Sequence, residues 1–130
     1  TDTLDDLRWK NRLLIVLHTD STSVALQQQT EWWRAEQEEA DERELLLIAV
    51  EPGGTGTIGS ESLRRPLVEE IAARFHRAGR DFEVVLVGKD GTEKERWQEP
   101  VPMGRVFALI DAMPMRRREM RERVGRGSGG

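Results

Sequence analysis

Three short apolar runs limit the folds open to this chain more than any other feature of its sequence. They lie at residues 13–17, 45–50 and 82–87, are rich in Leu, Ile and Val, and are bounded by polar residues or glycine. Such runs are typical of strands buried on both faces of a sheet. The long intervals after the first two runs can hold crossover helices. The sequence therefore predicts an α/β fold in which the first two runs are adjacent parallel strands.

Amphipathic helical patterns fill the intervals between and after these runs. The predicted helices lie at residues 24–43, 62–79 and 103–113. The second is the best defined, because Ser62 can cap its start, Pro66 falls within the tolerated first turn and Gly79 can end it. The third ends at Pro114, after which residues 115–123 can continue as a further turn or helix.

A hairpin is predicted after the third run. Residues 88–91 read Gly-Lys-Asp-Gly, a turn signal, and the polar residues 93–97 that follow are expected to form an exposed edge strand. With a short helix near residues 3–8, the order of the main elements is βαβαββα. This order predicts a sandwich in which a mixed four-stranded sheet carries helices on both faces.

Length and composition suit one domain without a membrane span. A chain of 130 residues can bury about two thirds of its unfolded surface, and we expect one domain over residues 1–124 with a flexible Gly/Ser-rich tail at residues 125–130. The longest apolar run, residues 45–50, is far shorter than the roughly 20 residues of a membrane helix. The mean hydropathy of -0.61 also predicts a soluble protein.

The residue types that carry most enzyme chemistry are scarce. The chain has no cysteine and no tyrosine, and its two histidines are His18 and His76. Without cysteine, thiol redox chemistry, disulfides and cysteine-containing zinc sites are excluded. The two histidines are too far apart in the sequence for a metal-ligand motif. We therefore predict neither a metal nor a cofactor.

One polar cluster follows the first predicted strand, where open α/β sheets bind their ligands. It contains His18, Asp20, Ser21 and Ser23. In one interpretation His18 is a general base, Asp20 orients it, and Ser21 or Ser23 is the nucleophile. In the other, which we favour, the Asp and Ser residues are N-caps of the following helix.

A glycine-rich segment at residues 54–59 matches the pattern G-x-G-x-x-G, which brings the backbone close to a pyrophosphate in dinucleotide-binding folds. It follows the second strand, and too little chain remains after it for such a fold. Asp81, about 20 residues on, precedes a strand rather than ending one. We favour a mobile loop over a phosphate site.

Charge is distributed unevenly along the chain. Residues 1–63 carry 5 basic and 13 acidic side chains, whereas residues 64–130 carry 15 and 11. Six arginines lie between residues 116 and 126. We favour a solvated helix face that interacts with the helix dipole, and the alternative is a protein partner bound by this Arg-rich C-terminal helix. No aromatic residues are interleaved with the arginines, so no nucleic-acid partner is expected.

Five side chains are candidates for binding a partner: Trp32, Trp33, Lys89, Arg116 and Arg117. Trp32 and Trp33 cannot both face the core from one helix, so one is expected to cover the sheet while the other closes a pocket or contact. Arg116 and Arg117 follow a Met-Pro-Met unit that can bend a helix, and we expect them to pair with acidic groups such as those in residues 24–43.

Three segments of the sequence resemble a family of domains of unknown function. They are residues 8–14, 88–91 and 107–120, and the resemblance spans about residues 4–120, with the glycine-rich loop matching least. Members of this family are small bacterial proteins, often exported, and modules of vertebrate extracellular-matrix and sushi-repeat proteins. The resemblance implies a peroxiredoxin-like domain with a thioredoxin-type fold. With a first residue that is not Met, it also implies a periplasmic or secreted location, the alternative being cytoplasmic.

The redox site of that fold class has no counterpart here. Peroxiredoxins carry Pro-x-x-x-Thr-x-x-Cys after the first strand, and alignment on Thr22 puts His18 at the proline position and Ala25 at the cysteine position. We expect no thiol peroxidase or disulfide oxidoreductase activity. The sequence therefore favours a non-enzymatic binding or adaptor module, the alternative being a cofactor-free enzyme that uses His18, Asp20 and Ser21.

Overall fold

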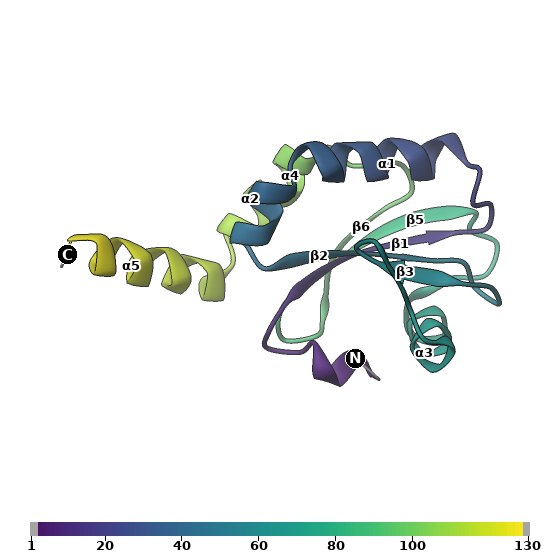
Figure 1. Ribbon diagram of the computed structural model, residues 1–130, viewed down its shortest axis with the longest axis horizontal. Coiled ribbons are helices and arrows are strands. Elements are labelled where there is room, and N and C mark those ends of the chain that lie inside the picture. Colours follow the sequence, from purple (N-terminus) through teal and green to yellow (C-terminus); the bar gives the residue numbers. More distant parts are fainter. Residues whose placement is uncertain (1–2, 129–130) are drawn as a thin grey trace.

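The three apolar runs form the three central strands of a six-stranded sheet (Figure 1). The computed structural model describes residues 3–128. Its strands are β1 (Arg12–His18), β2 (Leu45–Val50), β3 (Gly56–Ile58), β4 (Glu61–Ser62), β5 (Phe82–Val87) and β6 (Glu93–Trp97). Its helices are a 3-10 turn η1 (Leu4–Asp6), α1 (Val24–Ala35), α2 (Gln37–Glu42), α3 (Arg65–Phe75), α4 (Met103–Asp111) and α5 (Pro114–Ser128).

Strand pairing follows the prediction at the centre of the sheet. The strand order is β4-β3-β2-β1-β5-β6. Strand β1 is parallel to β2, with Leu13 opposite Leu46, and antiparallel to β5, with Leu13 opposite Val87. Strand β6 pairs with β5 as the predicted antiparallel edge strand. The amino ends of β1 and β2 therefore lie beside the end of β5.

Every residue of β1 is buried, because helices cover both faces of the sheet. Leu13, Ile15 and Leu17 belong to the core formed with η1 and α3. Leu14 and Val16 belong to the opposite core, which α1, α2 and α4 cover. In Figure 1 these three helices lie on one side of the sheet and α3 lies on the other. This arrangement confirms the predicted α/β sandwich.

The sheet has two strands more than the four predicted. Strand β3 lies within the glycine-rich segment, which the sequence analysis assigned to a loop, and β4 follows directly after that segment. Gly56 pairs with Val50 at a close approach, since a Cβ atom there would stand 3.0 Å from the carbonyl oxygen of Ala49. The short length and small side chains of this hairpin leave no apolar alternation, so its sequence lacks a strand signal.

Two predicted helices have different limits in the structure. The helix expected over residues 24–43 divides at Glu36, whose backbone leaves the helical region. The helix expected over residues 62–79 begins after Arg64, because Ser62 belongs to β4. It ends at Phe75, whose carbonyl accepts a hydrogen bond of 2.9 Å from Arg96. His76 then takes an extended backbone conformation, so the helix ends before Gly79.

The predicted bend at Pro114 is present. Helix α4 ends at Asp111 and α5 begins at Pro114, then runs away from the sheet layers (Figure 1). Helix α5 continues through Ser128, and the last two residues of the tail predicted at 125–130 lie outside the described residues. The division into one domain and a flexible tail stays a prediction. Within residues 3–128, no helix combines the length and the apolar character of a membrane span.

Candidate functional site

The polar cluster at the carboxyl end of β1 is built as a set of local caps. Asp20 accepts hydrogen bonds from the amide of Thr22 at 2.9 Å and from its hydroxyl at 2.7 Å, and these bonds lower the pKa of Asp20. Ser23 is the N-cap of α1 and accepts a bond of 3.0 Å from the amide of Leu26. Ser21 is exposed. These are the contacts expected if the Asp and Ser residues are N-caps of α1.

His18 is buried beside this cluster without joining it. Burial lowers the pKa of His18, and the carboxylates of Glu51 and Asp20 oppose that effect. Its Nδ1 has no hydrogen-bond partner, and among the described residues no hydrogen bond links His18 to Asp20 or Ser21. The structure therefore brings the three residues near one strand end but does not connect a base to its orienting carboxylate or to a nucleophile.

The two tryptophans of α1 divide as the sequence predicts. Trp33 is 5% exposed and packs in the core against α4, whereas Trp32 is partly exposed. Trp32 lines a shallow pocket with Pro102, Met103 and Gly104. Trp33 is thus a core residue, and Trp32 is the one of the pair that lies at a pocket.

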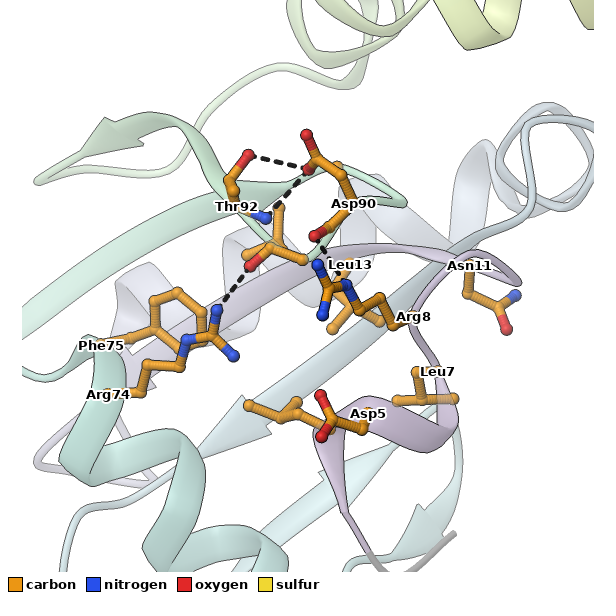
Figure 2. Close-up of a pocket in the computed structure, with 13 residues that line it drawn as sticks. Asp5, Leu7, Arg8, Asn11, Leu13, Arg74, Phe75, Asp90 and Thr92 are labelled. Carbon is orange, nitrogen blue, oxygen red and sulfur yellow. Dashed lines mark hydrogen bonds between the residues drawn. The ribbon is translucent and has the colours of Figure 1, made fainter.

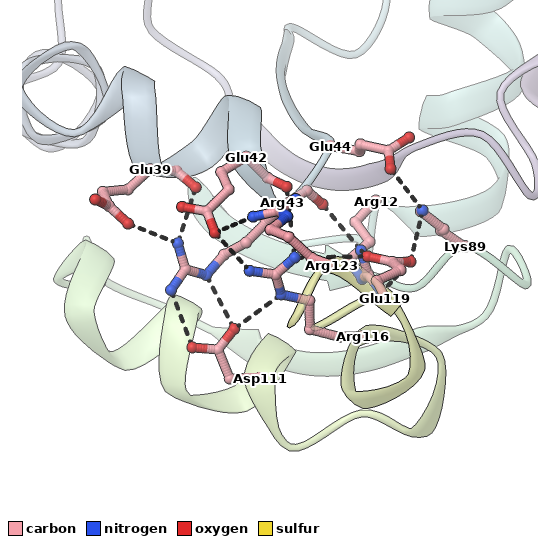
Figure 3. Close-up of polar contacts among 10 residues, drawn as sticks. All are labelled: Arg12, Glu39, Glu42, Arg43, Glu44, Lys89, Asp111, Arg116, Glu119 and Arg123. Carbon is pink, nitrogen blue, oxygen red and sulfur yellow. Dashed lines mark hydrogen bonds and ion pairs between the residues drawn. The ribbon is translucent and has the colours of Figure 1, made fainter. Parts of the chain in front are cut away.

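A dense group of charged side chains lies at the opposite end of β1, its amino end (Figure 3). We call this group the ionic cluster. Its members come from β1, α2 and the residues after it, the β5–β6 turn, the end of α4, and α5. They are Arg12, Glu39, Glu42, Arg43, Glu44, Lys89, Asp111, Arg116, Glu119 and Arg123. The cluster joins the C-terminal helix to the sheet.

Glu119 of α5 is the centre of one half of the cluster. Its two carboxylate oxygens accept hydrogen bonds of 3.3 Å from the two terminal nitrogens of Arg12. The ammonium group of Lys89 lies 2.7 Å from Glu119 and 3.1 Å from Glu44. Arg12 also donates to the carbonyl of Arg43 at 2.9 Å. One carboxylate therefore neutralises cations from the first strand and from the β5–β6 turn.

Asp111 is the centre of the other half of the ionic cluster. It accepts hydrogen bonds from Arg43 at 2.9 and 3.1 Å and from Arg116 at 3.2 Å. Arg116 also bonds to Glu42 at 3.2 Å, and Arg123 bonds to the same carboxylate. The guanidinium of Arg43 lies 4.4 Å from the ring centre of Phe107, a cation–π contact. These contacts fix the corner between α4 and α5 against α2.

Four of the five cations of the cluster are more deeply buried than its anions, and the exception is Arg123, whose side chain is 56% exposed. Arg12 and Arg116 are 1% exposed and Lys89 is 7% exposed, whereas the side chains of Glu119 and Glu44 are 22% and 51% exposed. Burial alone would raise the pKa of Glu119, but Lys89 and Arg12 outweigh it and hold the pKa below its ordinary value. The cluster is thus a buried cationic layer that carboxylates cover from the solvent side.

An apolar groove adjoins the cationic layer. It has a volume of about 450 Å³ and lies between the β5–β6 turn and the corner between α4 and α5. We call it the groove. Leu109, Ala112, Met113, Pro114 and Met115 supply its apolar lining. Its polar lining consists of Arg12, Lys89, Asp90, Lys94 and Glu95, with the backbone of Gly88.

A smaller pocket of about 130 Å³ lies on the other side of the same turn (Figure 2). There Arg8 donates to the carbonyl of Asp90 at 3.1 Å and Arg74 donates to the carbonyl of Gly91 at 2.9 Å. Inside the turn, the carboxylate of Asp90 accepts from the amide and hydroxyl of Thr92. Both arginines hold the β5–β6 turn in place, and this turn forms one wall of the groove.

The structure places the predicted binding residues at different sites. Lys89 and Arg116 are members of the ionic cluster, and Arg116 pairs with Glu42 near the end of the segment that the sequence analysis named. Arg117 is exposed, and among the described residues its side chain has no ion pair. Adjacent helical residues point about 100° apart, so Arg116 and Arg117 cannot both enter the cluster.

Sequence reasoning missed Arg12, Glu119 and the groove, although one signal pointed to them. The segments at residues 8–14, 88–91 and 107–120, which carry the family resemblance, meet at the ionic cluster and the groove. Each segment is ordinary by itself. Their shared location makes this end of the sheet the candidate functional site.

Comparison with known protein families agrees with that resemblance. The model of a family described as "Domain of unknown function (DUF4174)" matches residues 3–119, which is most of the chain. This chain belongs to the DUF4174 family. The ionic cluster and the groove lie within the matched region, except for Arg123 of the cluster.

Relatives of this DUF4174 chain include much longer proteins. Sushi repeat-containing protein SRPX2 of Mus musculus is 30% identical over 125 residues, which is 93% of this chain but 26% of the relative. Coiled-coil domain-containing protein 80 of Danio rerio is 37% identical over 68 residues, which is 52% of this chain and 8% of the relative. The chain spans about a quarter or less of the length of these curated relatives.

Solved structures similar to this DUF4174 chain are peroxiredoxins. The reduced 2-Cys peroxiredoxin of Plasmodium vivax superposes with a TM-score of 0.59 at 13% identity, over 84% of this chain and 68% of that chain. Thioredoxin peroxidase I of Plasmodium yoelii gives 0.58 at 16% identity, over 84% and 76%. At such identities the likeness concerns the fold alone, and it confirms the predicted thioredoxin-like fold.

Proposed function

We propose that this domain is a non-enzymatic binding module, and that it binds its ligand in the groove. The groove carries this proposal, because apolar walls with a few charged groups at one end are typical of ligand sites. Its walls are formed by segments that carry the family resemblance. The two faces of the β5–β6 turn are held by Arg8 and Arg74 on one side and by Lys89 on the other, so the groove is preformed.

The relatives support a modular role. Because the matched region is 26% of SRPX2, the same domain occurs there beside other parts of a longer protein. We take this occurrence as one part of a longer protein as support for a recognition role, while the site itself has to carry the argument. A periplasmic or secreted location and a bacterial origin belong to the same proposal, and the family resemblance is their support. Fractionation of cells that express the complete gene product would test the location.

The loss of redox chemistry also favours binding. Ala25, which takes the position of the peroxiredoxin cysteine, lies in the first turn of α1, and the chain has no cysteine that could replace it. We expect no turnover of hydrogen peroxide with a thiol reductant and no reduction of insulin. Turnover above a buffer control that persists after metal chelation would contradict this proposal.

The cofactor-free enzyme remains the competing proposal, and it makes its own prediction. If His18, Asp20 and Ser21 formed a catalytic unit, Ser21→Ala would abolish hydrolysis of an activated ester such as p-nitrophenyl acetate. We expect the rate to be the same in the variant and the wild type. Ser23→Ala removes the other candidate nucleophile, and we expect it to leave the rate unchanged as well, although it lowers stability because Ser23 caps α1.

Binding in the groove can be tested with a small neutral probe. We would label the methionine methyl groups with ¹³C and titrate 1-octanol while recording NMR spectra. Met113 and Met115 line the groove and should shift, whereas Met103 is 3% exposed in the core and should not. Ala112→Trp should fill the groove and remove the shifts. Shifts confined to other sites, or unchanged in the variant, would contradict the proposal.

A protein partner for the Arg-rich helix is a second candidate. It is favoured by α5, which runs away from the sheet layers with Arg117 and Arg118 exposed (Figure 1). These arginines are free to face an acidic surface. Charge reversal by Arg117→Glu and Arg118→Glu should then weaken association with a partner without unfolding the domain.

A further inference from the structure

We propose that the ligand of the groove is a small amphipathic monocarboxylate, whose carboxylate binds Lys89 and whose apolar chain lies against the corner between α4 and α5. This inference rests on the proposed function, because it assumes that the groove is the binding site. It adds the chemical class of the ligand. It is carried by the cavity, its charged end and the acidic groups at its rim.

The size and lining of the groove suit a small molecule with an apolar body. A volume of about 450 Å³ lies within the usual range for ligand pockets, roughly 300–1,000 Å³. The thioethers of Met113 and Met115 flank Pro114 in its lining. Methionine adapts its shape to varied apolar partners, so this wall can accommodate a flexible chain.

The cationic end of the groove has unused hydrogen-bond donors. An ammonium group has three donors, and Lys89 uses two of them, one for the carboxylate of Glu44 and one for that of Glu119. The Nε atom of Arg12 is buried and has no hydrogen-bond partner among the described residues. Both side chains line the groove. A ligand acceptor at this end would bond to the third donor of Lys89.

The protein carboxylate beside Lys89 is also exchangeable. The side chain of Glu44 is 51% exposed, so it returns to water readily if a ligand carboxylate takes its place. Lys89 is 7% exposed, and a bond to a buried ammonium is stronger than one at the surface. Glu119 would keep its bonds to Arg12 and maintain the cluster.

The rim of the groove limits the ligand to one negative charge. Asp90 and Glu95 line the groove together with the cations. Lys94 is already paired with Asp90 at 2.9 Å, and hydrogen bonds and the charge of Lys94 lower the pKa of Asp90 to about 2 against the effect of burial. Asp90 therefore stays ionised, and with Glu95 beside it at the rim it would repel a second anionic group.

Octanoate and 1-octanol form a matched pair that tests this inference, because they share an apolar chain and differ in the carboxylate. In methionine-methyl NMR titrations at pH 7.5, octanoate should bind with a Kd at least about tenfold lower than that of 1-octanol. Suberate, which adds a second carboxylate, should bind more weakly than octanoate. In Lys89→Met the preference for octanoate should disappear, whereas Lys10→Gln, at an exposed lysine outside the groove, should keep it.

The outcomes separate this inference from the proposed function. If 1-octanol binds in the groove and octanoate binds no tighter, the carboxylate inference is wrong and the binding module stands. If neither compound shifts Met113 or Met115, both are wrong. If octanoate binds at Arg8 and Arg74 instead, the inference is wrong, and Ala112→Trp, which blocks the groove alone, would leave that binding unchanged. The comparison of the two compounds on the wild type needs no variant to fold.

Discussion

The two ends of β1 carry polar residues of very different kinds. At the carboxyl end, Asp20 and Ser23 bond to atoms two or three residues away. At the amino end, Arg12 bonds to Glu119, which is 107 positions away in the sequence. The first set closes the start of one helix, whereas the second holds five separate elements together. Contacts of the first kind are local and those of the second kind define the tertiary structure.

The position of a polar cluster in a fold class is therefore a weaker guide to function than its contacts. The carboxyl end is where open α/β sheets bind ligands, and its residues are engaged in capping. The amino end has the buried cations, and the groove opens beside them. This difference leads to three predictions: two concern the amino end, and the third compares the two ends.

The largest effect is expected from Glu119→Gln. This change removes the carboxylate shared by Arg12 and Lys89 and leaves two buried cations without it. Breaking a buried pair from one side typically costs about 3 kcal/mol or more, so the free energy of unfolding should fall by about 3 kcal/mol in urea titrations. The control Glu31→Gln, on the exposed face of α1, should change it by less than about 0.5 kcal/mol.

A small effect of Glu119→Gln would remove the contrast between the two ends. If the free energy of unfolding fell by less than about 1 kcal/mol, the ionic cluster would behave like an ordinary set of surface salt bridges. The groove would then lack a rigid wall. The clearest such result would be an equal change in the free energy of unfolding for Glu119→Gln and Glu31→Gln.

The next effect distinguishes two neighbouring arginines. Arg116→Gln removes bonds to Asp111 and Glu42 from a side chain that is 1% exposed, and it should cost about 2 kcal/mol. For a chain of this size, that is a fall in Tm of roughly 6 °C. Arg117→Gln should leave Tm within about 1 °C, because Arg117 is exposed. Equal losses would show that α5 is held by something other than the cluster.

The sequence predicts the elements well where the signal lies within one segment. The apolar runs became β1, β2 and β5, the turn at 88–91 became a hairpin, and Pro114 separates two helices. Periodicity reports which face of a segment is buried, and a cap is read from the next few residues. Both kinds of information are local.

The cluster could not be predicted in the same way. Arg12 and Glu119 look like solvated charges until β1, the β5–β6 turn and α5 are placed together, because charge in a sequence does not name its partner. The predicted end of α3 was also wrong, and the residue that bonds to its last carbonyl, Arg96 of β6, is remote from it in the sequence. The family resemblance marked the right segments without showing how they meet.

The smallest effect is a difference in pH dependence between the two ends. Burial lowers the pKa of His18, so the unfolded chain binds this proton more readily and the His18 contribution to stability is lost as pH falls below about 6.5. The pKa of Glu119 is also lowered, against burial, by Lys89 and Arg12. Its contribution is present above about pH 4.5 and is lost as pH falls further.

Urea titrations at a series of pH values would resolve the two windows. His18→Gln should reduce the loss of stability between pH 7.5 and 5.5 and leave the loss below pH 4.5 unchanged. Glu119→Gln should do the opposite, because Gln cannot be protonated in that range and the remaining carboxylates titrate as before. His18 lies at the carboxyl end of β1, whereas Glu119 of α5 bonds to Arg12 at its amino end. Since the two residues share no partner, the double variant should show the sum of both changes. A non-additive result would mean that the two ends of β1 are coupled through the strand.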